Sequence, residues 1–283
     1  MDTQAVLDNV STISSDNAII VDAKEFLTEL RQVAGAVAKP SEQRPNLTFV
    51  HMILSESSIK LEATDSHVLD STYVAASVAP ELVGKEILLD GKFAKNLSKA
   101  PTKHKGTLAI YPAFDDEKYL GKTTIVLDGE AFIDDSRENI SSFGYPDLKM
   151  LEPYWDTAQI EFKTTKKEIL PILREIKKTT DSKKNYRVDI EGIDVNGDMY
   201  LTSDTKKFQI PMRELKTGDE LNKNFYDWRD TQLIAFNVTK LISELKNVRP
   251  SETLIFRFWS KLRPFTISRE NGGYSLVCPL RTF

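Results

Sequence analysis

The sequence has only one cysteine, Cys278, among its 283 residues. This excludes a scaffold held together by intrachain disulfides, which is typical of small secreted domains. The sequence also lacks any apolar run near the roughly 18 residues that a membrane-spanning helix needs. Its first residues, Met1-Asp-Thr-Gln, have neither the basic start nor the apolar centre of a signal peptide. We therefore expect a cytoplasmic protein that does not associate with a membrane.

An excess of positive charge is also missing. The 38 lysines and arginines are outnumbered by 42 aspartates and glutamates, which gives a net charge of −4. This total excludes a simple polycation that coats nucleic acid, although it does not describe how the charges are distributed over the surface. Length and a hydrophobic content of 40% suit a globular chain of about two domains.

Complete motifs for catalysis or metal binding are absent as well. Gly121-Lys-Thr123 resembles the end of a phosphate-binding loop, but Asp116 stands where that loop requires its first glycine. His51, His67 and His104 lie far apart and have no cysteine or carboxylate at metal-ligand spacing. We expect no metal, no cofactor and no catalytic residue.

A pattern of strands and capped helices fills the first half of the chain. Residues 1–16 are polar and are predicted to form a flexible tail. Asp22 and Asp90 each follow a short apolar run and are suited to cap a helix. Alternating apolar residues predict strands at 18–21, 47–54, 59–63, 68–74, 86–89, 107–111, 123–127 and 130–134.

The second half repeats this order. The segment Lys167-Glu-Ile-Leu-Pro-Ile-Leu-Arg174 falls 143 residues after Lys24-Glu-Phe-Leu-Thr-Glu-Leu-Arg31 and matches it at Lys, Glu, Leu, Leu and Arg. Ser203-Asp204-Thr205 likewise repeats Thr64-Asp65-Ser66, and Asn237 can cap a second helix. Further strands are predicted at 160–162, 189–195, 198–202, 233–236, 253–259, 265–268 and 274–278. This repetition indicates a duplicated α+β fold, with antiparallel sheets and two helices in each half.

Six short motifs follow one another along the chain. Three lie in the first half, namely Arg44-Pro-Asn-Leu-Thr-Phe-Val50, Leu61-Glu-Ala-Thr-Asp-Ser-His67 and Phe143-Gly-Tyr-Pro-Asp147, which is followed by Pro153. Three lie in the second half, namely Ile234-Ala-Phe-Asn-Val238, Arg263-Pro264 and Tyr274-Ser-Leu-Val-Cys-Pro-Leu-Arg281. In sequence and in order, over roughly residues 17–283, they resemble the bacterial β sliding clamp, the processivity subunit of DNA polymerase III.

The resemblance implies a DNA clamp fold with two domains. Residues 17–153 resemble the family's middle domain and residues 154–283 its C-terminal domain, whereas its first domain has no counterpart here. Because a clamp ring contains six such domains, we expect a ring made as a homotrimer. The implied function is that of a processivity factor, with duplex DNA, a DNA polymerase and a clamp loader as partners.

The resemblance also implies a groove for short partner peptides, beside the turn at Thr64-Asp65-Ser66-His67. Two departures from the family are Val68, where a basic residue is usual, and Cys278, where a methionine is usual. The implied groove residues are Leu47, Thr64, Ser66, His67, Val68, Leu69, Pro146, Met150, Leu151, Asn237, Lys240, Leu276, Val277, Cys278, Pro279, Leu280 and Arg281.

Basic residues are concentrated on the predicted helices of both halves. Helices that pack one face on a sheet would leave these side chains on a common surface for DNA phosphates, although ordinary solvated helix faces are the alternative. The residues expected to face DNA are Lys24, Arg31, Lys39, Lys95, Lys99, Arg174, Lys177, Lys178, Lys246 and Arg249. Two other hypotheses remain open at this point. One is a clamp-like protein that forms no ring and sequesters partner peptides, and the other is an enzyme that uses an acid cluster.

Overall fold

Two compact units make up the protein in the computed structural model. Unit 1 contains Met1–Asp65 and Asp70–Asp147, and unit 2 contains Ser66–Leu69 and Leu148–Phe283. The structure describes residues 17–40, 44–100, 106–114, 120–135, 144–152, 155–194, 196–217, 232–260 and 262–280. The domain boundary that we placed after residue 153 stays a prediction.

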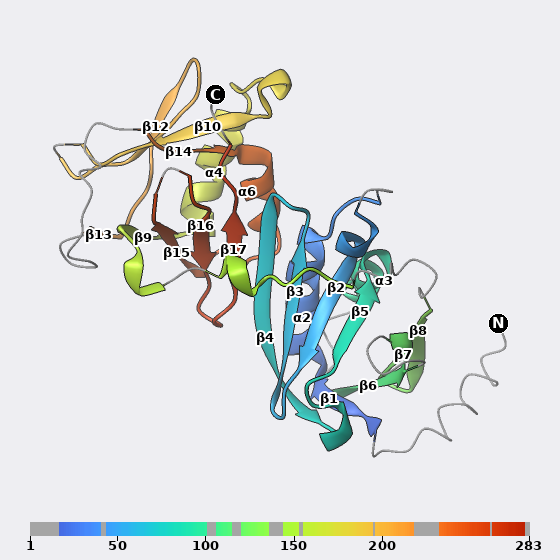
Figure 1. The fold of residues 1–283 in the computed structure, drawn as a ribbon. Coiled ribbons are helices and arrows are strands. Elements are labelled where there is room, and N and C mark those ends of the chain that lie inside the picture. The colour runs from blue at the N-terminus through green and yellow to red at the C-terminus, as the bar shows by residue number, and fades with distance from the viewer. Residues whose placement is uncertain are drawn as a thin grey trace. The chain divides into compact units, whose positions relative to one another are not determined.

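Unit 1 is built from antiparallel strands (Figure 1). One sheet has the order β4-β1-β6-β7-β8, and in a second group β2 pairs with both β3 and β5, while β3 also pairs with β4. The strands are β1 (Ile19–Asp22), β2 (Phe49–Leu54), β3 (Ser58–Thr64), β4 (Val68–Val78), β5 (Glu86–Asp90), β6 (Thr107–Phe114), β7 (Leu120–Leu127) and β8 (Glu130–Asp134). The first two residues of β4, Val68 and Leu69, are counted with unit 2.

The two helices of unit 1 each begin directly after a strand, at the aspartate that was predicted to cap them. Helix α2 (Ala23–Val33) begins after Asp22, whose carboxylate accepts a hydrogen bond from the Glu25 amide at 2.8 Å. Helix α3 (Gly91–Leu97) begins after Asp90, which accepts from the Phe93 amide at 2.8 Å. Both predicted caps are confirmed, because each carboxylate satisfies an amide that has no partner inside its helix.

Unit 2 contains sheets β13-β9-β15-β16-β17 and β12-β11-β10-β14, all antiparallel. Its strands are β9 (Ile160–Thr165), β10 (Arg187–Glu191), β11 (Tyr200–Thr202), β12 (Lys207–Gln209), β13 (Glu214–Thr217), β14 (Gln232–Asn237), β15 (Thr253–Phe258), β16 (Phe265–Ser268) and β17 (Tyr274–Val277). Its helices are α4 (Lys166–Lys177) and α6 (Val238–Glu244). Stacked Phe162 and Phe256, with ring centroids 4.8 Å apart, lie in its core.

The two units have the same connectivity. Strand β9 pairs with β13 and β15 as β1 pairs with β4 and β6, and β10 pairs with β11 and β14 as β2 pairs with β3 and β5. In each unit the two helices pack against one another. The predicted duplicated α+β fold is therefore confirmed.

Short 3-10 turns connect several of these elements. They are η2 (Ala34–Ala36), η3 (Pro45–Thr48), η4 (Pro80–Leu82), η6 (Lys149–Leu151), η7 (Trp155–Thr157) and η8 (Ser182–Lys184).

Some predicted boundaries were wrong. Leu47 lies in η3 and not in a strand, because Pro45 starts a turn there. The strand predicted at 189–195 ends at Glu191, and β12 and β13 were not predicted at all. These two strands take the place of the single long strand β4 of unit 1, and each is too short to show clear alternation.

Candidate functional site

A pocket of about 230 Å³ lies in unit 2, and part of its lining comes from residues 150–152. Its rim includes Met150 and Leu151 of η6, which are 90% and 45% exposed, and its wall includes Trp259 and Leu276, which are buried. Glu152, Arg263 and Pro264 complete the lining. An apolar hollow with one carboxylate and one guanidinium at its edge suits a single large apolar side chain with polar neighbours.

Residues 66–69 pack with unit 2 and lie against its last strand. The Cys278 amide donates a hydrogen bond to the His67 carbonyl at 2.8 Å. Ser66 has a φ of 76°, a left-handed conformation that a serine adopts at a cost in free energy. Val68 and Leu69 are buried, whereas the His67 side chain is exposed. The turn after β3 therefore presents the imidazole to solvent and turns two aliphatic side chains inward.

The chain beyond β17 is held against unit 2 by its backbone. The Leu280 amide donates to the carbonyl of Ala235 in β14 at 2.8 Å. Cys278, Pro279 and Leu280 are half-buried, and Val277 is buried. In the same unit, Asn237 caps α6 by accepting from the Thr239 amide at 2.9 Å. The predicted cap is confirmed, and this side-chain oxygen is therefore already engaged.

The structure divides the predicted groove residues between the two units. Leu47 and Thr64, both buried, and Pro146, which is exposed, belong to unit 1. Arg281 lies outside the described residues. The predicted residues in unit 2 are Ser66, His67, Val68, Leu69, Met150, Leu151, Asn237, Lys240, Leu276, Val277, Cys278, Pro279 and Leu280. Of these, the pocket lining contains Met150, Leu151 and Leu276.

Four lining residues were missed by the sequence reasoning, namely Glu152, Trp259, Arg263 and Pro264. Arg263-Pro264 had been noticed only as a motif, and nothing in the sequence marked Trp259 as a neighbour of Met150.

Basic side chains recur at matching positions on the first helix of each unit. Lys24 and Arg31 of α2 correspond to Lys167 and Arg174 of α4 by the 143-residue repeat. These residues lie on the side of each helix away from its buried apolar face, and Lys24, Lys167 and Arg174 are exposed. The corresponding stripe therefore carries positive charge in both units, with Arg31 half-buried in unit 1.

Arg31 also has a structural role within unit 1. Its Nε donates to the carbonyl of Ser98 at 2.9 Å, and its Nη2 contacts the same oxygen. Ser98 follows the last residue of α3, where helix carbonyls lack partners and attract cations. The guanidinium thus joins α2 to the end of α3, and only part of it faces solvent.

Lys166 has the corresponding role in unit 2. Its Nζ donates to the carbonyls of Lys246 and Val248 at 2.7 and 2.6 Å, just beyond α6. Burial lowers the pKa of this ammonium group, and the positive charge of Arg174 lowers it further. A basic residue on the first helix therefore satisfies carbonyls at the end of the second helix in both units.

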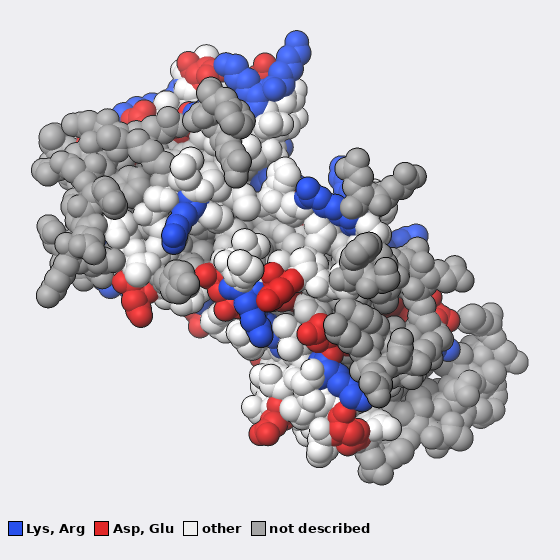
Figure 2. All heavy atoms as spheres, viewed as in Figure 1, with Lys and Arg blue, Asp and Glu red and all other residues white. Residues whose placement is uncertain are grey.

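The other residues predicted to face DNA have exposed side chains. They are Lys24, Lys39, Lys95, Lys99, Arg174, Lys177, Lys178, Lys246 and Arg249. Lys178 forms an ion pair with Glu175 of the same helix at 2.6 Å. Figure 2 shows Lys and Arg side chains beside Asp and Glu side chains on the face that it presents. No single charge sign covers that face.

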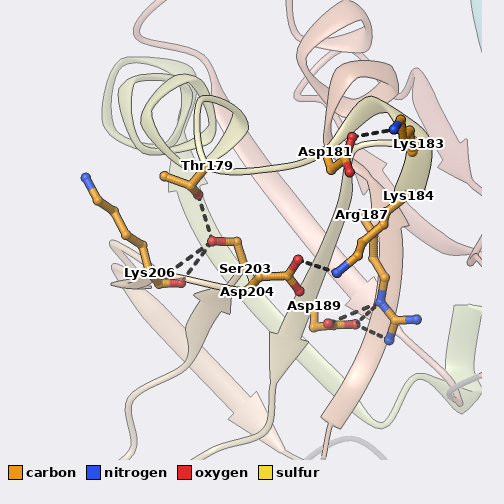
Figure 3. A network of polar contacts seen from close by, with 9 residues as sticks. All are labelled: Thr179, Asp181, Lys183, Lys184, Arg187, Asp189, Ser203, Asp204 and Lys206. Atoms are coloured by element: carbon orange, nitrogen blue, oxygen red, sulfur yellow. Dashed lines mark hydrogen bonds and ion pairs between the residues drawn. The ribbon is translucent and has the colours of Figure 1, made fainter.

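Ser203 and Asp204, from the segment that repeats Thr64-Asp65-Ser66, take part in a network of polar contacts in unit 2 (Figure 3). The Thr179 hydroxyl lies 2.7 Å from the Ser203 hydroxyl, and Lys184 forms an ion pair with Asp204 at 2.5 Å. The turn between β11 and β12 is thereby tied to the chain that follows α4. The polar side chains of Ser203 and Asp204 are therefore accounted for by contacts within unit 2, without a ligand.

Two further features concern only the part of the chain that the structure describes. There, no three His, Cys, Asp or Glu side chains come together as a metal ion would require. No helix among these residues is both long and apolar enough to cross a membrane.

Comparison with protein family models and with curated sequences finds no match. Solved structures do match, and among them is the DNA polymerase sliding clamp of Bacillus subtilis, with a TM-score of 0.76 and 21% identity over 96% of this chain. The chain has the fold of a DNA sliding clamp. The β subunit of DNA polymerase from Streptococcus pyogenes gives a TM-score of 0.75 and 21% identity over 95% of this chain.

A clamp from Pseudomonas aeruginosa, solved with griselimycin bound, shows the same clamp fold at lower identity. It gives a TM-score of 0.72 and 12% identity over 94% of this chain. In each case the chain spans about two thirds of the clamp's length, namely 66% for Bacillus, 67% for Streptococcus pyogenes and 65% for Pseudomonas. The clamp fold is therefore clear over most of the chain, and what the chain does is a separate question.

Proposed function

We propose that this protein is a DNA sliding clamp, a non-enzymatic processivity factor that encircles duplex DNA and tethers a DNA polymerase. The observation that carries the proposal is the repeated basic stripe on the first helix of two units with the clamp fold, Lys24 and Arg31 in one and Lys167 and Arg174 in the other. Lys24, Lys167 and Arg174 are exposed, and exposed cations on the helices of a clamp fold are able to reach DNA phosphates.

The proposed DNA contacts are to phosphates and not to bases. A protein that slides must hold the duplex without fixing its position, and phosphate oxygens are equivalent along the helix whereas base edges are not. Long, exposed lysine and arginine side chains can follow successive phosphates, often through water. The carboxylates in surplus over the whole chain would then keep DNA away from other faces.

The pocket of unit 2 is proposed to hold short peptides from the polymerase and the clamp loader. A hollow of about 230 Å³ accepts one leucine or phenylalanine side chain, and Met150, which is 90% exposed, lies in its lining. Because so small a contact buries little surface, the expected dissociation constant is on the order of micromolar. Trp259 in the lining provides the assay once Trp155 and Trp228 are replaced by phenylalanine, since its fluorescence changes when a peptide enters the pocket.

The ring is proposed to contain three copies if each subunit contributes only the two units described here. Six units per ring is the closed arrangement that the clamp resemblance implies, and closed cyclic symmetry favours equal copies. The solution mass tests this number directly. A strictly monomeric mass at micromolar concentration would favour instead a clamp-like protein that binds partner peptides without encircling DNA.

Retention on circular DNA tests the encircling function. The protein is loaded on a nicked circle with a clamp loader, the circle is cut once, and the release of protein is measured. A closed ring must slide off after the cut but stay on the uncut circle. Equal retention on both forms would contradict the proposal, because a protein bound only to the DNA surface is indifferent to free ends.

A further inference from the structure

His51 of β2 lies between two carboxylates in unit 1. Its Nδ1 is 2.9 Å from Oε1 of Glu62 on β3, and its Nε2 is 3.0 Å from Oε2 of Glu86 on β5. The side chains of His51 and Glu62 are 6% and 3% exposed, whereas that of Glu86 is 47% exposed. The imidazole therefore joins three neighbouring strands on one face of the sheet.

Glu62 is ionised in this environment. Burial by itself would raise the pKa of its carboxyl group, but the hydrogen bond from His51 and the charge of Lys60 outweigh burial and lower that pKa. Lys60 lies 3.0 Å from the second oxygen of the same carboxylate. One buried carboxylate thus has a cation on one side and the imidazole on the other.

The two contacts of the imidazole depend on its charge. An ionised carboxylate only accepts hydrogen bonds, so both contacts are hydrogen bonds only when each ring nitrogen carries a proton. A neutral ring keeps one proton. This proton stays on Nδ1, because the buried carboxylate of Glu62 has no access to water and accepts the hydrogen bond from it. Nε2 would then turn a lone pair toward Glu86, whose exposed carboxylate is free to rotate into solvent.

The imidazole also supports the chain segment that leaves unit 1. The ring of Tyr145 lies on that of His51, with centroids 4.6 Å apart and planes inclined by 34°. The side-chain Nδ2 of Asn46 donates a hydrogen bond to the carbonyl of Gly144, the residue before Tyr145. In Figure 1 this segment, Gly144–Asp147, runs in front of β3 and β2. Burial raises the pKa of the Tyr145 phenol, and the negative charge of Glu62 raises it further.

We propose that His51 is a charge-dependent latch for the segment Gly144–Asp147. Protonated, the ring is fixed by both carboxylates and offers Tyr145 a rigid surface. Neutral, it is held by Glu62 alone, and the tyrosine loses part of its support. Among the described residues, the ionisable groups around this ring are Lys60 and Glu62 from β3, Glu86 from β5 and Tyr145 itself. The proposal does not depend on whether the protein encircles DNA.

Hydrogen exchange of the intact chain tests the latch. The loss of the second proton from His51 is first located by the nitrogen-15 shifts of its ring, and backbone exchange is then measured below and above that pH. After correction for the intrinsic rate, the amides of Tyr145 and Asp147 should exchange about tenfold faster at the higher pH, since one hydrogen bond to a charged group is lost. Equal corrected rates at both pH values would overturn the proposal.

Two substitutions separate the latch from general loosening. Glu86→Gln supplies an amide that can accept from Nε2–H or donate to its lone pair, so the slow rate should persist at both pH values. His51→Gln removes the ring, and the fast rate should appear at both. Glu56→Gln removes an exposed carboxylate of the same unit and should behave as the wild type. If the Glu86→Gln protein keeps the wild-type pH dependence, the carboxylate has no part in the latch and the proposal fails.

Discussion

The basic stripe on α4 leads to a quantitative prediction for DNA binding. Replacing Arg174 and Lys178 by alanine removes two exposed cations from one helix face. Each phosphate contact contributes about 0.9 to the slope of log affinity against log salt concentration, so the double variant should lose up to about 1.8 from that slope. The free energy of unfolding should change by less than about 0.5 kcal/mol, because the Lys178 ion pair with Glu175 is exposed.

The assay is fluorescence anisotropy of a short labelled duplex, titrated with protein at several salt concentrations. Lys216→Ala is the matched control, because it also removes one cation from unit 2. Lys216 lies opposite Glu161 across the sheet, on the face of β9 away from buried Phe162. The control should keep the wild-type slope. A double variant with an unchanged slope, or a control that loses as much per charge, would refute a DNA-facing role for α4.

Three further predictions concern the pocket and the packing. Met150→Asp should weaken the binding of a leucine-containing peptide at least about tenfold, as measured by Trp259 fluorescence. The melting temperature should not change, because Met150 is 90% exposed. Gly91→Ala should destabilise unit 1 by about 1–3 kcal/mol in chemical denaturation, because a Cβ would overlap the carbonyl oxygen of Thr48. Lys166→Met should cost about 1–3 kcal/mol in the same measurement, because two carbonyls beyond α6 lose their donor; a change below 0.5 kcal/mol would contradict this account.

Local chemistry in the sequence determined much of the fold. Asp22, Asp90 and Asn237 were predicted as helix caps and are helix caps, because a side-chain oxygen next to the first helical amides acts over only three residues. The turn Asp128-Gly129 was also predicted, and both residues have the positive φ that such a hairpin requires. The repeat of 143 residues foretold that two halves with the same connectivity would form.

The tertiary structure alone decided which residues meet. Trp259 and Met150 are more than a hundred residues apart in the chain and line one pocket, and no local pattern links them. His51, dismissed as a metal ligand from its spacing, proved to be held by carboxylates from two other strands. Strand register sets such contacts, and register follows from the packing of the whole sheet.

The sequence by itself determined that Arg31 and Arg174 would recur at equivalent positions on two helices, since a helix places residues seven apart on one face. Only the tertiary structure showed that Arg31 also binds the carbonyl of Ser98 at the end of another helix. The physical reason is the distance along the chain over which each kind of interaction acts. Periodicity and capping depend on neighbours within about two turns, whereas a guanidinium finds its partner only after two helices have packed side by side.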